Sequence, residues 1–215
     1  EAQMITDAAY NDVLNFIKPG VTEKEIALFI EFNMRKKGAE AVSFDLIAIS
    51  GKNTSLPHGV PTDKPIEKGD FVTMDIGAVF EGYHSDMTRT VGIGEVSQEQ
   101  KKIYDIVLEA HNNALEKVRS GISCEEIDTA ARSIIEKYGY GEFYKHSTGH
   151  GVGLDIHEQP FVAPRCKTIL STGMVITIEP GIYLPDKFGV RTEDMVFVMN
   201  DTYLDLTMAP KKLII

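Results

Sequence analysis

The hydrophobic positions along this chain follow two spacings, one typical of helices and one typical of strands. Apolar residues three and four positions apart, such as Ile26, Ile30 and Met34, predict amphipathic helices. The helices expected from this pattern are residues 2–16, residues 97–119, and two more that begin after Thr22 and after Ser123. Runs of β-branched and aromatic residues between turn residues predict strands at residues 44–50, 71–80, 83–93, 175–178, 192–199 and 203–206.

The same order of elements occurs twice along the chain. Residues 69–77 resemble residues 173–181, and their alignment places Asp75 opposite Glu179, each a lone carboxylate in an apolar strand. A hydroxyl residue three positions before Glu or Gln forms a capping box at a helix start. Three such pairs occur here, namely Thr22 with Glu25, Ser97 with Gln100, and Ser123 with Glu126. Each half therefore consists of a helix, a loop, a second helix and a cluster of strands.

Clustered strands favour an α+β domain over a doubly wound parallel sheet, in which strands and helices would alternate. We expect one domain with approximate two-fold symmetry, its halves at about residues 1–95 and 96–215, and an antiparallel sheet covered by helices. The chain begins at Glu1 and is helical from its second residue. We therefore expect that an upstream N-terminal domain is absent from this chain.

Composition and charge exclude several classes of protein. Of the 215 residues, 43% are hydrophobic and 25% are charged, as in an ordinary globular domain. The net charge of −10 and the lack of a basic run make nucleic acid and anionic membranes poor partners. No apolar run approaches the roughly 18 residues of a membrane span, and no signal peptide is visible. The two cysteines form no CxxC pair, so we expect a reducing, cytoplasmic compartment.

Four carboxylates occupy or flank the expected strands: Asp75, Asp86, Glu179 and Glu193. The tight turn at residues 80–83 would form a hairpin that places Asp75 and Asp86 on adjacent antiparallel strands. Any one of the four, taken alone, would more often be a surface acid or an ion-pair partner. Burying a carboxylate is costly unless something compensates its charge. Acids at repeated positions therefore predict a shared metal site.

Three of the six histidines lie close together in the second half: His146, His150 and His157. Glycines at positions 149, 151 and 153 let the backbone around them approach other groups closely. Opposite a set of carboxylates, such a cluster is typical of a metal or proton-transfer site. His58 in the first half is a rough counterpart of His157. A lone histidine is more often structural, and we expect His111 to lie at the surface of its amphipathic helix.

One nitrogen donor with four carboxylates and no thiolate suits two hard or borderline divalent ions, such as manganese, cobalt or zinc. Two such ions can activate a bridging water and polarise a carbonyl group. Nucleophilic catalysis is a weaker interpretation, because no Gly-x-Ser-x-Gly elbow occurs. Cys124, at a helix start without a neighbouring histidine, is expected to be an exposed residue without a chemical role.

Several motifs, taken in order, resemble those of the pita-bread metallopeptidases, which include methionine aminopeptidase, aminopeptidase P and prolidase. The motifs are residues 74–77, 83–90, 148–153, 156–158, 177–181 and 191–194, and the resemblance covers nearly the whole chain. It implies the pita-bread fold and a dinuclear centre whose ligands are Asp75, Asp86, His150, Glu179 and Glu193. It also implies that Asp86 and Glu193 bridge the two ions and that Glu179 moves the proton of the bridging water.

The resemblance also implies roles for residues around the metals. It assigns substrate binding and stabilisation of the tetrahedral intermediate to His58, His146 and His157. It makes Arg191 the residue that orients a ligand carboxylate, and it places Tyr183 near the metal centre. The arginine two residues before the last glutamate, Arg191 before Glu193, makes this part of the sequence resemble the Xaa-Pro branch of the family, which comprises aminopeptidase P and prolidase.

Membership of that branch would make the protein an exopeptidase that releases an N-terminal residue ahead of proline. Its expected substrates are short peptides with proline at the second position, and its expected cofactors are two divalent ions. Manganese is favoured, with cobalt or zinc as alternatives, and the full-length protein is expected to be a homodimer. Methionine aminopeptidase specificity, a strict dipeptidase and a non-catalytic binding module on the same fold stay open.

Overall fold

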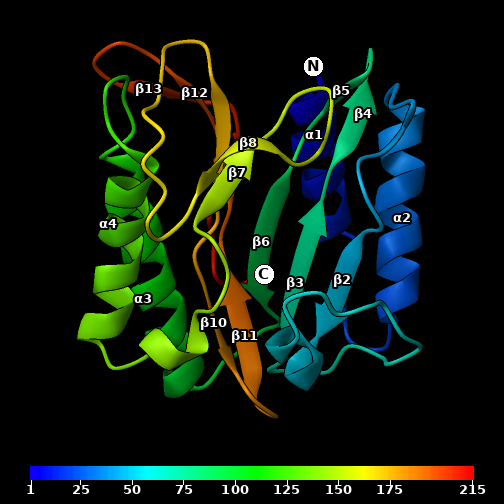
Figure 1. The fold of residues 1–215 in the computed structure, drawn as a ribbon. Coiled ribbons are helices and arrows are strands. Elements are labelled where there is room, and N and C mark those ends of the chain that lie inside the picture. Colours follow the sequence, from blue (N-terminus) through cyan, green and yellow to red (C-terminus); the bar gives the residue numbers. More distant parts are fainter.

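Four α-helices enclose the strands of this structure, with α3 and α4 on one side of the view and α2 on the other (Figure 1). The computed structural model describes residues 1–215. The helices are α1 (Ala2–Leu14), α2 (Glu23–Lys36), α3 (Gln98–Leu115) and α4 (Cys124–Lys137), with 3₁₀-helices η1 (Gly51–Ser55) and η2 (Gly141–Phe143). Each of α2, α3 and α4 begins with the capping box expected from the sequence, which confirms those three predictions.

Thirteen short strands form four sheets, and every pairing between them is antiparallel. The strands of the first half are β1 (Ala41–Val42), β2 (Ile47–Ser50), β3 (Phe71–Ile76), β4 (Ala78–Phe80), β5 (Tyr83–His84) and β6 (Met87–Gly92). Those of the second half are β7 (Gly149–Gly151), β8 (Glu158–Val162), β9 (Val175–Ile178), β10 (Gly181–Leu184), β11 (Phe188–Arg191), β12 (Asp194–Val198) and β13 (Tyr203–Asp205). The sheet orders are β2-β3-β6, β13-β12-β9-β7-β8, β1-β4-β5 and β10-β11. The predicted α+β class is confirmed.

Several expected strands differ in extent from those observed. The predicted strand at residues 71–80 is interrupted at Gly77, where a Cβ atom would lie 2.0 Å from the carbonyl oxygen of Ser85. The predicted strand at residues 83–93 is likewise divided into β5 and β6. Strands β1, β7, β8, β10 and β11 were not predicted, because they have only two to five residues and several contain glycine.

The repeat seen in the sequence recurs in the backbone contacts. An isolated antiparallel bridge joins Thr22 to Pro65 just before α2, and another joins Ser123 to Ile169 just before α4. The pairs β3–β6 and β9–β12 are both antiparallel, and they carry or flank the repeated acids. Equivalent elements of the two halves thus bring equivalent residues to the middle of the molecule.

The molecule has two hydrophobic cores, one of 21 residues that come almost entirely from the first half and one of 25 residues that come almost entirely from the second. Two expectations about the second half are wrong. Cys124 is fully buried in its core, because the first turn of α4 packs inward. His111 is also fully buried, with its imidazole against the carboxylate of Asp194. None of the helices is long and apolar enough to cross a membrane.

Candidate metal centre

A cleft of about 680 Å³ contains nine of the ten residues that the sequence singled out. These nine are His58, Asp75, Asp86, His146, His150, His157, Glu179, Arg191 and Glu193. The tenth, Tyr183, lines a neighbouring cavity of about 750 Å³, which His58 and His146 also border. The cleft therefore collects residues from both halves of the chain.

Short strands position the acids of the cleft. Asp75 lies in β3 opposite Thr88 of β6, and Asp86 lies directly before β6. The turn between β4 and β5 forms the expected hairpin, with Phe80 opposite Tyr83. In the second half, Glu179 directly follows β9. The backbone N–H of Glu193, the residue before β12, donates to the carbonyl of Thr88 (3.1 Å), so the two halves meet at this point.

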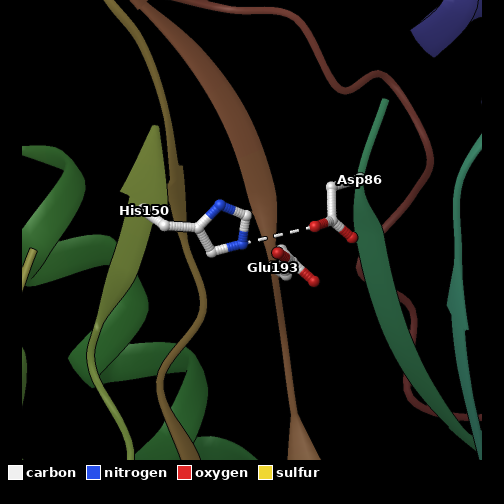
Figure 2. A group of neighbouring side chains, drawn as sticks. All are labelled: Asp86, His150 and Glu193. Atoms are coloured by element: carbon white, nitrogen blue, oxygen red, sulfur yellow. Dashed lines mark ion pairs between the residues drawn. The ribbon is translucent and has the colours of Figure 1, made fainter. Parts of the chain in front are cut away.

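Asp86, His150 and Glu193 form the tightest group in the cleft. Each offers one ligand atom, and these atoms all lie within 4.8 Å of one another. Figure 2 shows the three side chains converging from three different segments of the chain. His150 Nε2 lies 3.4 Å from Asp86 Oδ2 and 3.5 Å from Glu179 Oε1. All three residues of the group are buried, and burial is unusual for two carboxylates, Asp86 and Glu193, without a counter-charge.

The imidazole of His150 is held in the form that a metal ion requires. Its Nδ1 lies 2.9 Å from the carbonyl oxygen of Gly151, and a carbonyl can only accept, so Nδ1 carries the proton. In the neutral ring Nε2 therefore carries the lone pair, and Nε2 is the nitrogen that faces the acids. The hydroxyl of Thr177 accepts from the backbone N–H of His150 (3.0 Å) and donates to Glu179 Oε1 (3.2 Å). Such partners fix the orientation of metal ligands.

Burial and mutual repulsion raise the pKa values of the acids. The pKa of Asp86 is raised well above its ordinary value by burial and then by the charges of Asp75 and Glu179. The pKa of Glu193 is raised well above its ordinary value by burial and then by Asp86. Burial also raises the pKa of Glu179. The cleft thus concentrates negative charge that its own cations do not fully compensate.

The donor set fits divalent metal ions. Asp75 Oδ1 is buried without a hydrogen-bond partner, while Oδ2 accepts from Arg191 Nη2 (2.6 Å). An orphaned carboxylate oxygen beside other acids is the kind of atom that a cation would satisfy. Oxygen donors with one imidazole suit manganese, cobalt or zinc. The residues that could hold such ions are Asp75, Asp86, His150, Glu179 and Glu193.

Arg191 connects this group to the histidines on the other wall of the cleft. Its Nη1 donates to Tyr183 Oη (2.6 Å), and its Nε donates to Thr88 Oγ1 (3.0 Å). Thr88 in turn donates to Glu193 Oε2 (2.6 Å). Tyr183 Oη lies 3.0 Å from His146 Nε2, and His146 Nδ1 lies 2.8 Å from the carbonyl of Ser147. Because Nδ1 must donate to that carbonyl, Nε2 accepts from the phenol.

The protonation states follow from this chain of bonds. Burial raises the pKa of Tyr183 to about 12, so the phenol keeps its proton. Burial, and then the charge of Arg191, lowers the pKa of His146 to about 4, so its imidazole is neutral at neutral pH. His157 lies with its ring 4.4 Å from that of His150, and burial followed by the charge of His150 lowers its pKa. The cleft therefore holds at least one neutral imidazole, that of His146, beside its acids.

A second set of side chains holds the segment that carries His146. Arg132 donates from Nη2 to the carbonyl of His146 (3.0 Å) and from Nη1 to that of Tyr144 (3.0 Å). Asp128 fixes the guanidinium through two bonds of 2.8 and 2.9 Å. Its carboxylate also accepts from Thr148 Oγ1 (2.7 Å). Two residues of helix α4, Asp128 and Arg132, thus hold the segment that carries His146.

A buried arginine ties the two halves together beneath the acids. Arg89 donates from Nη1 to the carbonyls of Glu193 (2.6 Å) and Thr88 (2.9 Å), and from Nη2 to Asp194 Oδ1 (2.7 Å). His111 Nε2 lies 3.3 Å from Asp194 Oδ2, and Lys211 pairs with the same carboxylate. This cluster was not predicted from the sequence. Its only sequence signal is that Arg89 follows Asp86 by three residues and Asp194 follows Glu193 directly.

Comparison with known proteins agrees with this arrangement. The model of metallopeptidase family M24 matches residues 1–200. A Xaa-Pro dipeptidase of Pyrococcus horikoshii is 47% identical over 210 residues, which are 98% of this chain and 60% of that protein. An uncharacterized peptidase of Bacillus subtilis is 46% identical over 215 residues, all of this chain and 61% of that protein. The chain thus spans about three fifths of the length of these relatives.

Solved structures give the same result for the fold. The Xaa-Pro dipeptidase from Bacillus anthracis superposes with a TM-score of 0.98 at 49% identity, covering 100% of this chain and 61% of that one. The X-Pro aminopeptidase from Thermotoga maritima superposes with a TM-score of 0.97 at 44% identity, with the same coverage. The expected pita-bread fold is therefore confirmed.

We expect the imidazole of His146 to titrate near pH 4 in the metal-free protein, because it is buried beside Arg191. Since this value is below the 6.5 of an unfolded histidine, the residue's contribution to stability is present above pH 6.5. It is lost as the pH falls towards 4. NMR of the histidine ring signals, from well below pH 4 up to pH 8, measures the midpoint, with His146→Asn identifying the signal. A midpoint near 6.5 would contradict the structure.

Replacing Arg89 with methionine should lower the free energy of unfolding by about 3 kcal/mol, because it leaves the carboxylate of Asp194 buried with fewer partners. Methionine keeps most of the side-chain volume, so packing changes little. Urea denaturation of the metal-free protein measures the loss. The control is Arg119→Met at an exposed position, which should change stability by less than about 0.5 kcal/mol. Equal stability of the two variants would refute the role of Arg89.

Proposed function

Because the chain belongs to metallopeptidase family M24, we propose that it is a metal-dependent exopeptidase that cleaves an N-terminal residue from a following proline. The observation that carries the proposal is the buried group of Asp86, His150 and Glu193, with Asp75 and Glu179 beside it. Relatives named Xaa-Pro dipeptidase, at 46–47% identity, support the substrate class. The proposal treats residues 1–215 as one catalytic domain made of two related halves.

The proposed ligands are Asp75, Asp86, His150, Glu179 and Glu193, and they would hold two divalent ions, manganese first among the candidates. Bound ions of this kind activate water and polarise the carbonyl of the scissile bond. Asp86 and Glu193 are the ligands whose pKa values burial and neighbouring acids raise well above the ordinary range, so they would gain most from the positive charge of bound ions. The same carboxyl groups would otherwise have to bind protons.

The remaining residues would bind the peptide and move the proton. Glu179, whose pKa is raised by burial, would accept the proton of the attacking water at Oε1 and pass it to the proline nitrogen. The water oxygen bonds to the carbonyl carbon as it gives up this proton, and the carbon–nitrogen bond breaks afterwards, when the proline nitrogen receives the proton. His58, His146, His157 and Tyr183 line the cleft and the cavity next to it, and they would contact the peptide there. Arg191 would keep Asp75 and Tyr183 in place.

Two alternatives differ in substrate or in class. Methionine aminopeptidase specificity uses the same type of cleft, and the named relatives disfavour it. A non-catalytic binding module would not need three buried and two partly buried metal-binding donors. Relatives include both a dipeptidase and an aminopeptidase, so the preferred peptide length is decided by assay. A homodimer of the full-length protein and a cytoplasmic location stay predictions from the sequence.

We expect the protein to hydrolyse Ala-Pro or Ala-Pro-Ala when loaded with Mn²⁺, and to be inactive after chelation. Met-Ala-Ala should be cleaved far more slowly, because its second residue is not proline. Chromatography of the reaction mixtures measures the release of the N-terminal amino acid, and so the rate, for all three peptides. Faster cleavage of Ala-Pro identifies a dipeptidase, and faster cleavage of Ala-Pro-Ala identifies an aminopeptidase. Preference for Met-Ala-Ala, or metal binding without any hydrolysis, would overturn the proposal.

Replacing Glu193 with alanine should remove metal binding and hydrolysis together, because it deletes one donor of the tightest group. We expect the rate to fall by at least about a hundredfold, as is typical when a metal site loses a ligand or its support. Calorimetric titration with Mn²⁺ gives the number of bound ions in each variant. Glu31→Ala, on the surface of α2, is the control and should bind and cleave normally. Unchanged turnover in Glu193→Ala would refute the metal assignment.

A further inference from the structure

One wall of the cleft is a loop without regular pairing, the cleft loop, which we define as residues 51–61. Five consecutive residues of this loop, Pro57 to Pro61, line the cleft, and His58 is among them. The loop begins with η1, but residues 56–61 belong to no helix or strand. Its position must therefore be set by contacts other than a sheet ladder. Such contacts decide where His58 lies.

A single carboxylate outside the cleft binds both ends of the cleft loop. Glu23, the first residue of α2, is fully buried. Its Oε1 accepts from the backbone N–H of Ser50 (2.6 Å), the hydroxyl of Ser50 (3.0 Å) and Asn53 Nδ2 (3.0 Å). Its Oε2 accepts from the backbone N–H of Thr62 (2.9 Å) and from its hydroxyl (2.7 Å). Ser50 and Thr62 are the residues that directly flank the loop.

Two further contacts hold the middle of the cleft loop against the other half. Arg191 Nη1 donates to the carbonyl of Pro57 (3.2 Å), and the backbone N–H of Gly189 donates to Thr54 Oγ1 (2.9 Å). With both ends joined at Glu23, the loop is a closed surface loop of the kind whose shape depends on such ties. His58 is thereby fixed relative to Arg191.

Because the two halves of the chain are related, the second half shows which side chain the fold needs at the position of Glu23. The backbone N–H of Lys24 donates to the carbonyl of Thr62 (3.1 Å), and that of Glu125 donates to the carbonyl of Cys166 (2.9 Å). By this equivalence, Cys124 stands where Glu23 stands in the first half. Cys124 is buried in the second core, with Cys166 packed against that core. The fold thus forms this junction with uncharged side chains.

The two halves differ in how they hold the wall of the cleft. In the second half, the segment after His157 is strand β8, which pairs with β7 through a sheet ladder. The first half has no such ladder over residues 56–61, and there the junction carries a buried carboxylate with five donors. Because a buried charge is costly and the fold does not need one here, its bonds to the loop explain its presence.

We infer that Glu23 is a positioning residue that fixes the cleft loop, and with it His58, for binding of the peptide. This inference rests on the proposed function for its kinetic part, but the order of the loop is a separate property. Loss of the carboxylate should loosen residues 50–62 and weaken substrate binding. It should leave the metal ligands unchanged, since none of them contacts Glu23.

The test is Glu23→Gln, which keeps the size of the side chain but replaces one accepting oxygen with a donating NH₂ group. The new NH₂ group then lies against groups of the loop that themselves donate hydrogen bonds, so the bonds at one end of the loop are lost. We expect hydrogen exchange of residues 50–62 to become at least about tenfold faster. We also expect kcat/KM for the preferred Xaa-Pro peptide to fall by about tenfold, mainly through KM, as for the loss of a hydrogen bond to a charged group. The number of bound Mn²⁺ ions should not change.

Glu25→Gln is the matched control. Glu25 lies in the same first turn of α2 and also accepts hydrogen bonds as a carboxylate, but only from Thr22 in the cap. It should affect stability slightly and leave the exchange of residues 50–62 and the KM as in the unchanged protein. If Glu25→Gln had the same effects as Glu23→Gln, the role of Glu23 would be general helix stability and the inference would fail.

Two milder variants keep the inference testable if Glu23→Gln does not fold. Asn53→Ala and Thr62→Val each remove one donor to Glu23 and should each accelerate exchange in the loop by a smaller factor, with a smaller rise in KM. Unchanged exchange in all folded variants would overturn the inference. If the unchanged protein cleaved no Xaa-Pro peptide, the proposed function would fail, while faster exchange in the variants would still support the role of Glu23.

Discussion

The concentration of buried negative charge between the two halves is the constraint on which the rest of this structure depends. Asp86, Glu179 and Glu193 lie in one cleft, and burial raises the pKa of each. Such a group is unfavourable unless protons or cations compensate it. The neighbouring residues accordingly act as supports. Thr88 and Thr177 donate hydrogen bonds to individual carboxylate oxygens, and Arg191 neutralises Asp75.

Neither half of the chain could form this site alone. Each half supplies one acid at the end of a central strand and one acid directly before the strand that pairs with it. The halves are joined at these same points, where the backbone N–H of Glu193 donates to the carbonyl of Thr88 and Arg89 donates to the carbonyls of both residues. Contacts that hold the halves together therefore also set the spacing of the acids.

The sequence predicted the parts of the structure whose causes are local. The capping boxes depend on residues three positions apart, and the acids and Gly-flanked histidines belong to short motifs, so all of these could be found in advance. Strands such as β7 and β11 could not, because three or four residues that include glycine show no alternation. His111 and Glu23 were missed for another reason. Their partners, Asp194 for one and Ser50 and Thr62 for the other, lie far away in the sequence.

The arrangement of ion pairs explains why the negative charge of the cleft is not compensated by the side chains of the protein itself. Arg89 is paired with Asp194 and Arg191 with Asp75, so neither guanidinium forms an ion pair with Asp86, Glu179 or Glu193. Asp86, Glu179 and Glu193 are left facing a single imidazole, that of His150. Protons can neutralise these acids in the absence of metal, which is the physical meaning of their raised pKa values. Protons and metal ions therefore compete for the same oxygens, and metal affinity must increase as the pH rises and the protons leave.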